Sequence, residues 1–197
     1  MLFRSSNEAG SSQIYVRWLA TGDTALVTNI TSSPSSLTWS PDGRWLAFTM
    51  RVKVAQKPLV KPRKKPDGAK WAAPAKVVSS TRYQFDGRGI VEPAWRQIFV
   101  VPAEGGTARQ LTSGDYDHGG LLSWSKDSRQ ILFSSNRSDN WEMETFASDL
   151  YLVDVASGDL TQLTDEPGAE TSATFSPNGK QIAYLKIRDR KSTRLNS

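Results

Sequence analysis

Two expected strands and a tight turn occupy the segment Leu37-Thr38-Trp39-Ser40-Pro41-Asp42-Gly43-Arg44-Trp45-Leu46-Ala47-Phe48. Pro41 presets φ in the turn, and Gly43 supplies the positive φ that the turn requires. Aromatic residues close both strands, where a packed sheet favours bulky side chains. The pattern recurs at residues 122–133 and 173–184. A hairpin that recurs along a chain predicts a repeat architecture.

A second type of strand pair alternates with these hairpins. It has an apolar strand with a central aromatic residue, a glycine-containing turn and a further strand, and the later two copies end in Gln-Leu-Thr. Its strands are expected at residues 13–16 and 25–28, 97–101 and 109–112, and 149–155 and 160–164. This spacing of strands and Gly turns predicts antiparallel meanders. Because four-stranded meanders in tandem form the blades of a β-propeller, we expect an all-β fold of TolB- or WD-like repeats in an incomplete ring.

The repeats set the expected boundaries of a partial propeller over residues 1–187. We expect an outer half-blade at about 13–28, a blade at about 37–112 with an insertion at 52–96, a blade at about 122–164 and an inner half-blade at about 173–187. Residues 2–7 echo the end of a repeat's second strand. Residues 189–197 resemble the translation of a sequencing adaptor, so we expect a non-native tail there. The chain is thus expected to begin inside one repeat and to stop inside another.

The insertion interrupts the repeat with prolines and basic residues, which disrupt sheet ladders and are readily solvated. Residues 81–85 alternate polar and aromatic side chains before a turn at 86–89, so we expect a short hairpin there. The net charge of +5 originates here, because residues 51–76 carry +8 and the last nine carry +2, which leaves −5 for the rest. Lysines scattered among prolines do not form the shaped surface that nucleic acid requires, so we expect no nucleic-acid partner.

Composition excludes several classes of site. Cysteine is absent from the 197 residues, which excludes disulfides and thiolate chemistry, and a single histidine argues against a metal site. We therefore expect neither a metal nor a cofactor. No apolar run approaches the ~20 residues that cross a bilayer, so no membrane span is expected. We expect a soluble chain and leave its location open between cytoplasm and periplasm.

The repeats, of the form W-S-P-D-G-x-x-[IL]-A-F with Q-L-T, resemble the propeller of the prolyl oligopeptidase family of serine peptidases. The likeness covers about residues 2–186 and is greater for the acylaminoacyl-peptidase and dipeptidyl-aminopeptidase branch. The segments that carry it are Gly68-Ala69-Lys70-Trp71 in the basic insertion, Gln97-Ile98-Phe99-Val100-Val101-Pro102-Ala103-Glu104-Gly105-Gly106, and Leu111-Thr112-Ser113-Gly114-Asp115-Tyr116-Asp117-His118-Gly119-Gly120. The repeat alone also resembles TolB-type propellers.

This resemblance implies a propeller that precedes an α/β-hydrolase domain with a Ser-Asp-His triad and restricts access to its active site. The chain has no G-x-S-x-G nucleophile elbow, so we expect no catalytic residue within it. The expected partners are a C-terminal hydrolase domain and peptide substrates, and a homo-oligomer is a further expected assembly because the unpaired strand edges favour association. The alternative is a non-enzymatic, TolB-like propeller that serves as a protein-interaction module.

Substrate is expected at the end of the blades that carries the long connections, because loops held by a rigid scaffold usually carry function. Asp115, Asp117 and His118 form the densest polar cluster, in a connection expected to be a loop between blades. They are candidates for contact with substrate or the hydrolase domain. The alternative, which we favour, is that the carboxylates cap the loop and His118 is hydrogen-bonded.

Two further sets of charged residues are candidates for peptide termini. By resemblance to dipeptidyl peptidases, Glu142 and Glu144 would hold a free amino terminus through charge-assisted hydrogen bonds. They would share a face if they were on a strand, whereas a loop fixes nothing, and a solvated loop is the favoured interpretation. Arg137 and Arg82 are the alternative candidates, for a substrate carboxylate.

Overall fold

The structure is a computed structural model that describes residues 2–6 as main chain, and residues 12–54, 64–72, 78, 80–81, 83–87 and 89–187. All regular elements within these ranges are β-strands. In this part of the chain, no helix is both long enough and apolar enough to cross a bilayer. The chain divides into two units, residues 1–52 with 95–197, and residues 53–94.

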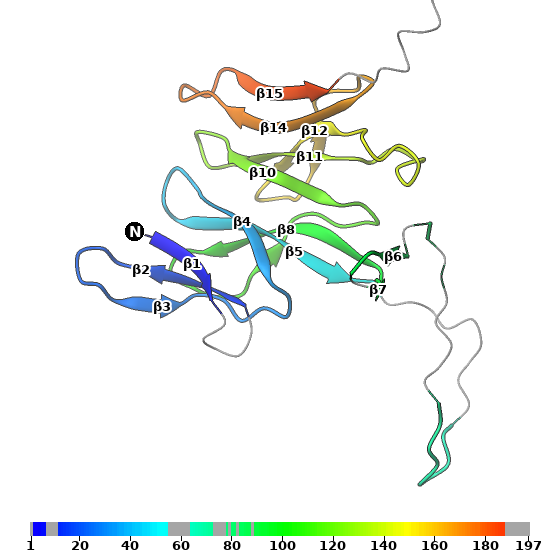
Figure 1. The fold of residues 1–197 in the computed structure, drawn as a ribbon. Coiled ribbons are helices and arrows are strands. Elements are labelled where there is room, and N and C mark those ends of the chain that lie inside the picture. The colour runs from blue at the N-terminus through cyan, green and yellow to red at the C-terminus, as the bar shows by residue number, and fades with distance from the viewer. Residues whose placement is uncertain are drawn as a thin grey trace, which may run out of the picture. The chain divides into compact units, whose positions relative to one another are not determined.

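Two four-stranded antiparallel sheets form the centre of the first unit (Figure 1). One sheet contains β4 (Pro34–Trp39), β5 (Trp45–Lys53), β8 (Ala94–Pro102) and β9 (Arg109–Gln110), in that order. The other contains β10 (His118–Trp124), β11 (Gln130–Ser135), β12 (Asp149–Asp154) and β13 (Leu160–Gln162). Each is a meander of neighbouring strands, which confirms the predicted blades.

The flanking sheets are smaller. The last contains β14 (Ala169–Phe175) and β15 (Ile182–Ile187), as the sequence predicts. The first contains β1 (Leu2–Ser6), β2 (Gln13–Arg17) and β3 (Thr24–Leu26). Residues 2–6, which echo the end of a repeat's second strand, pair along the whole of β2, from Leu2 opposite Arg17 to Ser6 opposite Gln13.

A short turn follows each of the inner strands β4, β10 and β14. Hydrogen bonds close it between a serine and the Asp or Asn side chain two residues later. Ser40 Oγ donates to Asp42 Oδ1 at 2.5 Å, the same oxygen accepts from Arg44 N at 3.0 Å, and Trp45 N donates to Ser40 Oγ at 2.9 Å. The Ser40 hydroxyl and then the Arg44 amide lower the pKa of Asp42. The pairs Ser125–Asp127 and Ser176–Asn178 repeat these contacts.

A bulge interrupts the start of each inner strand. The pairing register shifts between Ser35 and Thr38, between Gly119 and Ser123, and between Thr171 and Thr174. The bulges place Ser36, Gly120 and Ser172 at φ values of 53°, 80° and 55°. Two of the three lack the glycine that would mark such a position in the sequence, since serine rarely adopts positive φ. Sequence reasoning missed this shared bend.

The core lies between neighbouring sheets. One cluster joins β2, β5 and β8 through residues such as Ile14, Phe48 and Phe99, and a second joins β5 and β8 to β10, β11 and β12 through Ile98, Trp124 and others. A third joins the sheet of β10–β13 to that of β14 and β15. Consecutive residues of the second strands are completely buried because both faces of these sheets are covered: Leu46, Ala47 and Phe48 in β5, and Ile131, Leu132 and Phe133 in β11.

The aromatic residues at the ends of the inner strands occupy equivalent positions. Trp39 lies opposite Leu46, Trp124 opposite Ile131, and Phe175 opposite Ile182. Trp124 is buried, and the other two are partly buried against the neighbouring clusters. The repeat register predicted from these aromatics is therefore confirmed.

The second unit contains the predicted hairpin. Its strands are β6 (Gln84–Phe85) and β7 (Gly89–Ile90), with Gln84 opposite Ile90. Val91 N donates to Tyr83 O at 2.9 Å, which extends the pairing by one step. Lys64, Lys65 and Lys70 are exposed, as expected for a solvated basic insertion.

Candidate functional site

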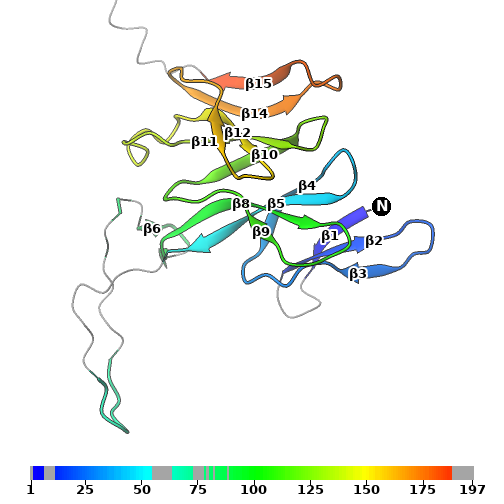
Figure 2. The ribbon, with the colours of Figure 1, turned by 180° about the vertical axis from the view of Figure 1, so that it is seen from behind.

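The long connections of the first unit meet at one end of the blades. Arg96 N, at the start of β8, donates to Asp117 Oδ1 at 2.6 Å, and Ser148 Oγ, before β12, donates to Glu170 O at 2.9 Å. The turns after β4, β10 and β14 lie on the side opposite connection 136–148 (Figures 1 and 2). We call residues 113–118, 136–148 and 163–170 the long-connection end.

A buried glutamine–threonine contact anchors these connections to the sheets. Gln97, the fourth residue of β8, donates from Nε2 to Gly114 O at 2.9 Å and accepts from Thr112 Oγ1 at 2.8 Å. Thr112 Oγ1 in turn accepts from Ile98 N at 2.9 Å. Gln13 and Thr28 form the same contacts in the first sheet, with Ile30 O as the acceptor of Nε2. The threonine of the repeated Gln-Leu-Thr motif is thus a structural residue that fixes where each connection begins.

The first group of charged residues at this end is the Arg137 centre, defined as Arg137, His118, Tyr116 and Tyr151. Arg137 NH1 lies 2.7 Å from His118 Nε2. The guanidinium carbon lies 4.8 Å from the centre of the Tyr116 ring and 5.8 Å from that of Tyr151, within the range of cation–π attraction. Two strands and two connections meet here, because His118 begins β10 and Tyr151 lies in β12, whereas Tyr116 is in the connection before β10 and Arg137 in the one after β11.

His118 is a strand residue and not the loop residue that the sequence suggested. It is completely buried, and its ring packs edge-on against Phe133 with 5.7 Å between ring centres. Burial, followed by the charge of Arg137, lowers its pKa from 6.5 to about 4, so the imidazole is neutral at pH 7. Because a guanidinium can only donate, Nε2 accepts this hydrogen bond and the proton of the neutral ring resides on Nδ1.

Asp117 caps the main chain, in agreement with the favoured alternative. Its carboxylate accepts from Arg96 N, and its carbonyl accepts from Ser135 Oγ at 2.9 Å. The Arg96 side chain crosses Gly119, where a Cβ atom would lie 2.8 Å from Arg96 Cδ, so any larger residue at that position would displace the Arg96 side chain. Asp115 is exposed, and nothing in the described part of the chain forms a hydrogen bond or ion pair with its carboxylate.

Glu142 and Glu144 lie in a turn of connection 136–148, not on a strand. Glu144 N donates to Asn140 O at 3.0 Å, and Asn136 Nδ2 donates to Glu144 O at 2.7 Å. Strand alternation therefore does not align the two carboxylates, and their role as an ammonium site stays a prediction. Arg82, the other candidate for a carboxylate, lies outside the described residues.

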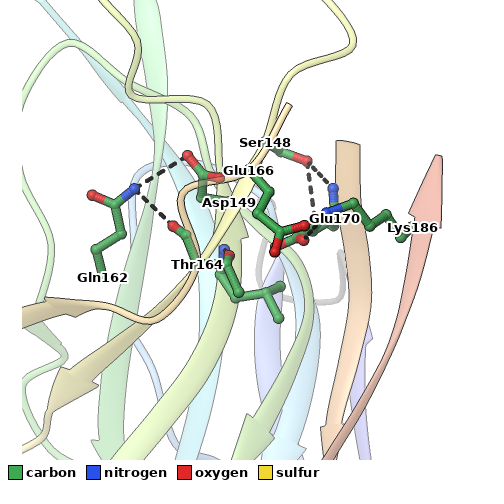
Figure 3. A network of polar contacts seen from close by, with 8 residues as sticks. Ser148, Asp149, Gln162, Thr164, Glu166, Glu170 and Lys186 are labelled. Carbon is green, nitrogen blue, oxygen red and sulfur yellow. Dashed lines mark hydrogen bonds and ion pairs between the residues drawn. The ribbon is translucent and has the colours of Figure 1, made fainter. Parts of the chain in front are cut away.

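The second group is the acid–lysine centre, defined as Asp149, Glu166, Glu170 and Lys186 (Figure 3). Glu170 is completely buried, and its Oε1 lies 3.0 Å from Lys186 Nζ, which also pairs with Glu166. Glu170 Oε2 has no hydrogen-bond partner among the described residues. The hydrogen bonds to Glu166 and Glu170 raise the pKa of Lys186.

Asp149 replaces the anchoring glutamine in this blade. Leu150 N still donates to Thr164 Oγ1 at 2.9 Å, and the Asp149 carboxylate accepts a 3.3 Å contact from Gln162 Nε2 (Figure 3). Burial, and then the charges of Asp165 and Glu170, raise the pKa of Asp149. Sequence reasoning missed this centre. A signal was present, since Asp149 stands where the other blades have Gln13 and Gln97.

The remaining chemistry of this end is aromatic and apolar. Trp95 and Trp141 pack edge to face with 4.9 Å between ring centres, and Met143 and Phe146 are 76% and 81% exposed. Within the described ranges, no group of three or more His, Cys, Asp or Glu side chains is arranged to hold a metal ion.

Comparison with known proteins relates this arrangement to peptidases. Residues 73–192 match the family described as the dipeptidyl peptidase IV (DPP IV) N-terminal region. The uncharacterized peptidase YuxL of Bacillus subtilis is 30% identical over 139 residues, which cover 71% of this chain and 20% of YuxL.

Two solved structures show the same fold. An acylaminoacyl peptidase of Pyrococcus horikoshii has a TM-score of 0.64 and 18% identity over 92% of this chain and 26% of that protein. TolB of Acinetobacter baumannii has a TM-score of 0.58 and 17% identity over 95% of this chain and 35% of that protein. The chain spans well under half the length of YuxL and of both solved proteins. The family match and the propeller fold together show that the chain belongs to the dipeptidyl peptidase IV N-terminal region family. This family consists of the propeller domains of prolyl-oligopeptidase-family peptidases.

Proposed function

We propose that this propeller positions peptide substrates for an α/β-hydrolase domain of a serine peptidase and restricts their access to it. The family match and the likeness to YuxL support a peptidase as the parent protein. The reaction would be peptide hydrolysis by acyl transfer through a serine nucleophile. The sequence holds no G-x-S-x-G motif, so the nucleophile would come from the hydrolase domain.

The observation that carries the proposal is the difference between the two ends of the blades. The long-connection end holds two charged centres and the exposed side chains of Met143 and Phe146. The opposite end holds the short turns, whose polar side chains are engaged in closing the turns themselves. A peptide offers charged termini and apolar side chains, and the long-connection end holds groups complementary to both.

The candidate residues would then have different roles. Arg137 would contact the substrate, whereas His118 and Asp117 would position Arg137 and the connection before β10. Asp115, Glu142 and Glu144 would lie at the rim, where carboxylates attract a peptide ammonium group through charge-assisted hydrogen bonds.

Photo-cross-linking tests which end meets peptide. The probe is an unstructured seven-residue peptide with a benzophenone side chain at its centre, incubated with the purified chain and mapped by mass spectrometry. We expect labels within 113–118, 136–148 and 163–170. Labels confined to 41–44, 126–129 and 177–180 would place peptide binding at the wrong end and contradict the proposal. The same peptide without the benzophenone, added in excess, serves as competitor.

A second candidate function is supported by the likeness to TolB over 95% of this chain. In that case the propeller would be a non-enzymatic module that binds other proteins. The reading frame downstream of this segment separates the two, since a G-x-S-x-G motif followed by Asp and then His supports the peptidase. A serine-reactive phosphonate tests the same question in solution. It should label the full-length parent if that protein is a peptidase, and the label should be lost when that serine is replaced.

A further inference from the structure

Arg137 is a partly buried cation without an acidic partner among the described residues. The ion pairs in this part of the chain are those of Lys53 with Glu92 and of Lys186 with Glu166 and Glu170. Arg137 contacts one neutral imidazole and two aromatic rings instead. Of the five N–H donors of its guanidinium, the hydrogen bond to His118 uses one. The structure thus holds an arginine in place and leaves most of its donors without an acceptor among the described residues.

The frame around Arg137 is rigid. His118 is completely buried, and Tyr151 is buried and stacks on Phe133 with 5.8 Å between ring centres. The neighbouring residues are fixed as well, because Asn136 Oδ1 accepts from both Ser138 N and Ser138 Oγ. An arginine whose conformation is already restricted loses less entropy when it binds a ligand.

The charges nearby favour a singly charged anion. Arg96 is also without an ion pair in the described part of the chain, and its side chain lies over Gly119, next to His118. Asp115 and Asp117 lie on the same connection and would repel a doubly charged phosphate more strongly than a carboxylate. A planar guanidinium matches a carboxylate through two parallel hydrogen bonds, which a lysine cannot reproduce.

We propose that the Arg137 centre binds a carboxylate of the peptide, from the C-terminus or from an acidic side chain. This inference rests on the proposed function, in which peptides meet the long-connection end. Arg137 makes the contact, His118 and Tyr151 position its guanidinium, and the carboxylate replaces the water that otherwise solvates it.

Three blocked peptides distinguish the sources of the carboxylate. They are acetyl-Ala-Ala-Ala with a free C-terminus, its C-terminal amide, and acetyl-Ala-Glu-Ala-amide. The acetyl group removes the ammonium, so the acidic residues of this end contribute little. The C-terminal amide of acetyl-Ala-Ala-Ala has no carboxylate. In calorimetric titrations of the whole chain at pH 7 and low salt, we expect it to bind at least about tenfold more weakly than one or both of the peptides that have one.

Variants assign this preference to Arg137. Arg137→Gln should abolish the preference for peptides with a carboxylate. Arg137→Lys keeps the charge but not the planar guanidinium, so it should retain part of that preference. Arg44→Gln removes an exposed arginine of a short turn at the other end and should change nothing. Circular dichroism melts of each variant identify one that fails to fold, in which case Arg137→Lys and the spectroscopic test below decide.

The single histidine of the chain gives a direct spectroscopic readout. Its imidazole resonances need no assignment, and a carboxylate bound to Arg137 would screen the charge that opposes protonation of His118. Whichever carboxylate peptide binds should therefore shift these resonances and raise the apparent pKa of His118, and the peptide without a carboxylate should do neither. A pKa that is unchanged by every peptide contradicts the inference.

The outcomes separate this inference from the function on which it rests. If all three peptides bind equally, peptides meet this protein but Arg137 does not select a carboxylate, and the inference fails alone. If no peptide binds but N-acetylglycine shifts the histidine resonances, the carboxylate site stands and the peptide function fails. If neither binds, both fail.

Discussion

The Arg137 centre and the acid–lysine centre occupy equivalent places in successive blades and have opposite chemistry. The pair His118–Ser135 of β10 and β11 corresponds in register to Glu170–Lys186 of β14 and β15, because each pair lies four residues after the one opposite the inner aromatic. In the sheet of β4, β5, β8 and β9 the same place holds Pro34–Met50. The backbone is shared, whereas one centre has an unpaired cation and the other has a buried carboxylate held by a lysine.

The comparison shows how a repeat protein acquires distinct sites. Bulges, anchoring threonines and serine-closed turns recur from blade to blade, and they fix where side chains are placed. One or two residues at equivalent places then determine the local charge. A histidine makes the Arg137 centre possible because a neutral ring can accept from a guanidinium, and an aspartate in place of glutamine adds negative charge to the other.

The largest expected effect comes from the core that supports both centres. Trp124 is buried between the sheets, and Trp124→Ala should destabilise the fold by roughly 3–5 kcal/mol because it leaves a cavity. Chemical denaturation followed by circular dichroism measures the change. Trp124 Nε1 has no hydrogen-bond partner within the described part of the chain, so the control Trp124→Phe should cost far less stability. A loss below ~1 kcal/mol for the alanine variant would mean that the strand register is wrong.

Acid should weaken the Arg137 centre. The pKa of His118 is lowered to about 4 in the fold from an ordinary 6.5, because burial and Arg137 oppose the charged form. The unfolded chain therefore binds the proton first, and the stability that the neutral ring supplies is complete above pH 6.5 and is lost as the pH falls towards 4. The loss amounts to about 3 kcal/mol from this group.

Two measurements isolate this contribution from that of the carboxylates. Titration of the single histidine by NMR should give a midpoint near pH 4. His118→Gln cannot titrate and can still accept from Arg137, so its stability should decline less steeply than that of the wild type between pH 6.5 and 4. A histidine midpoint near 6.5 would show that the ring is solvated and that the centre is not built as described.

The acid–lysine centre should respond to pH with the opposite sign. The pKa of Asp149 is raised by burial, Asp165 and Glu170, so its ionised form opposes folding above that pKa and ceases to do so as the pH falls through it. Asp149→Gln should restore the anchoring contacts of Gln13 and Gln97 and stabilise the fold by about 1 kcal/mol at pH 7. The gain should shrink in acid.

Asp149→Asn separates the two causes, because it removes the charge without the reach of glutamine. If both variants melt at the same temperature, the charge alone matters and the anchoring contact does not. A destabilising Asp149→Gln at pH 7 would contradict the equivalence of the three blades. Thermal melts at pH 7 and pH 4.5 are sufficient for each comparison.

The recurrent features of this molecule were predictable from sequence, and the individual ones were not. Hairpin periodicity predicts the blades and the inner aromatics because each repeat obeys the same packing. The cation–π contacts of Arg137 and the pairing of Glu170 with Lys186 join residues from separate connections, so no local pattern reveals them. The burial of His118 depends on the strand extending past its expected start, which follows from pairing with Ser135. The position of Asp149 in place of glutamine was visible but carries meaning only once its neighbours are known.

The smallest expected energetic effect concerns β15, the strand at the open edge of the sheet of β14 and β15. In the described part of the chain β11 is paired on both sides, whereas β15 is paired only with β14 and exposes 63% of Leu185 and 61% of Ile187. An unpaired apolar edge favours association between copies. Leu185→Lys should therefore shift the chain towards monomer in size-exclusion chromatography with light scattering, and should change stability by less than about 0.5 kcal/mol because the site is exposed. Leu121→Lys is the matched control, since Leu121 is 62% exposed but lies on the inner strand β10. Equal loss of association in both variants would indicate nonspecific apolar contacts, and a wild type that is already monomeric would show that the β15 edge does not drive assembly.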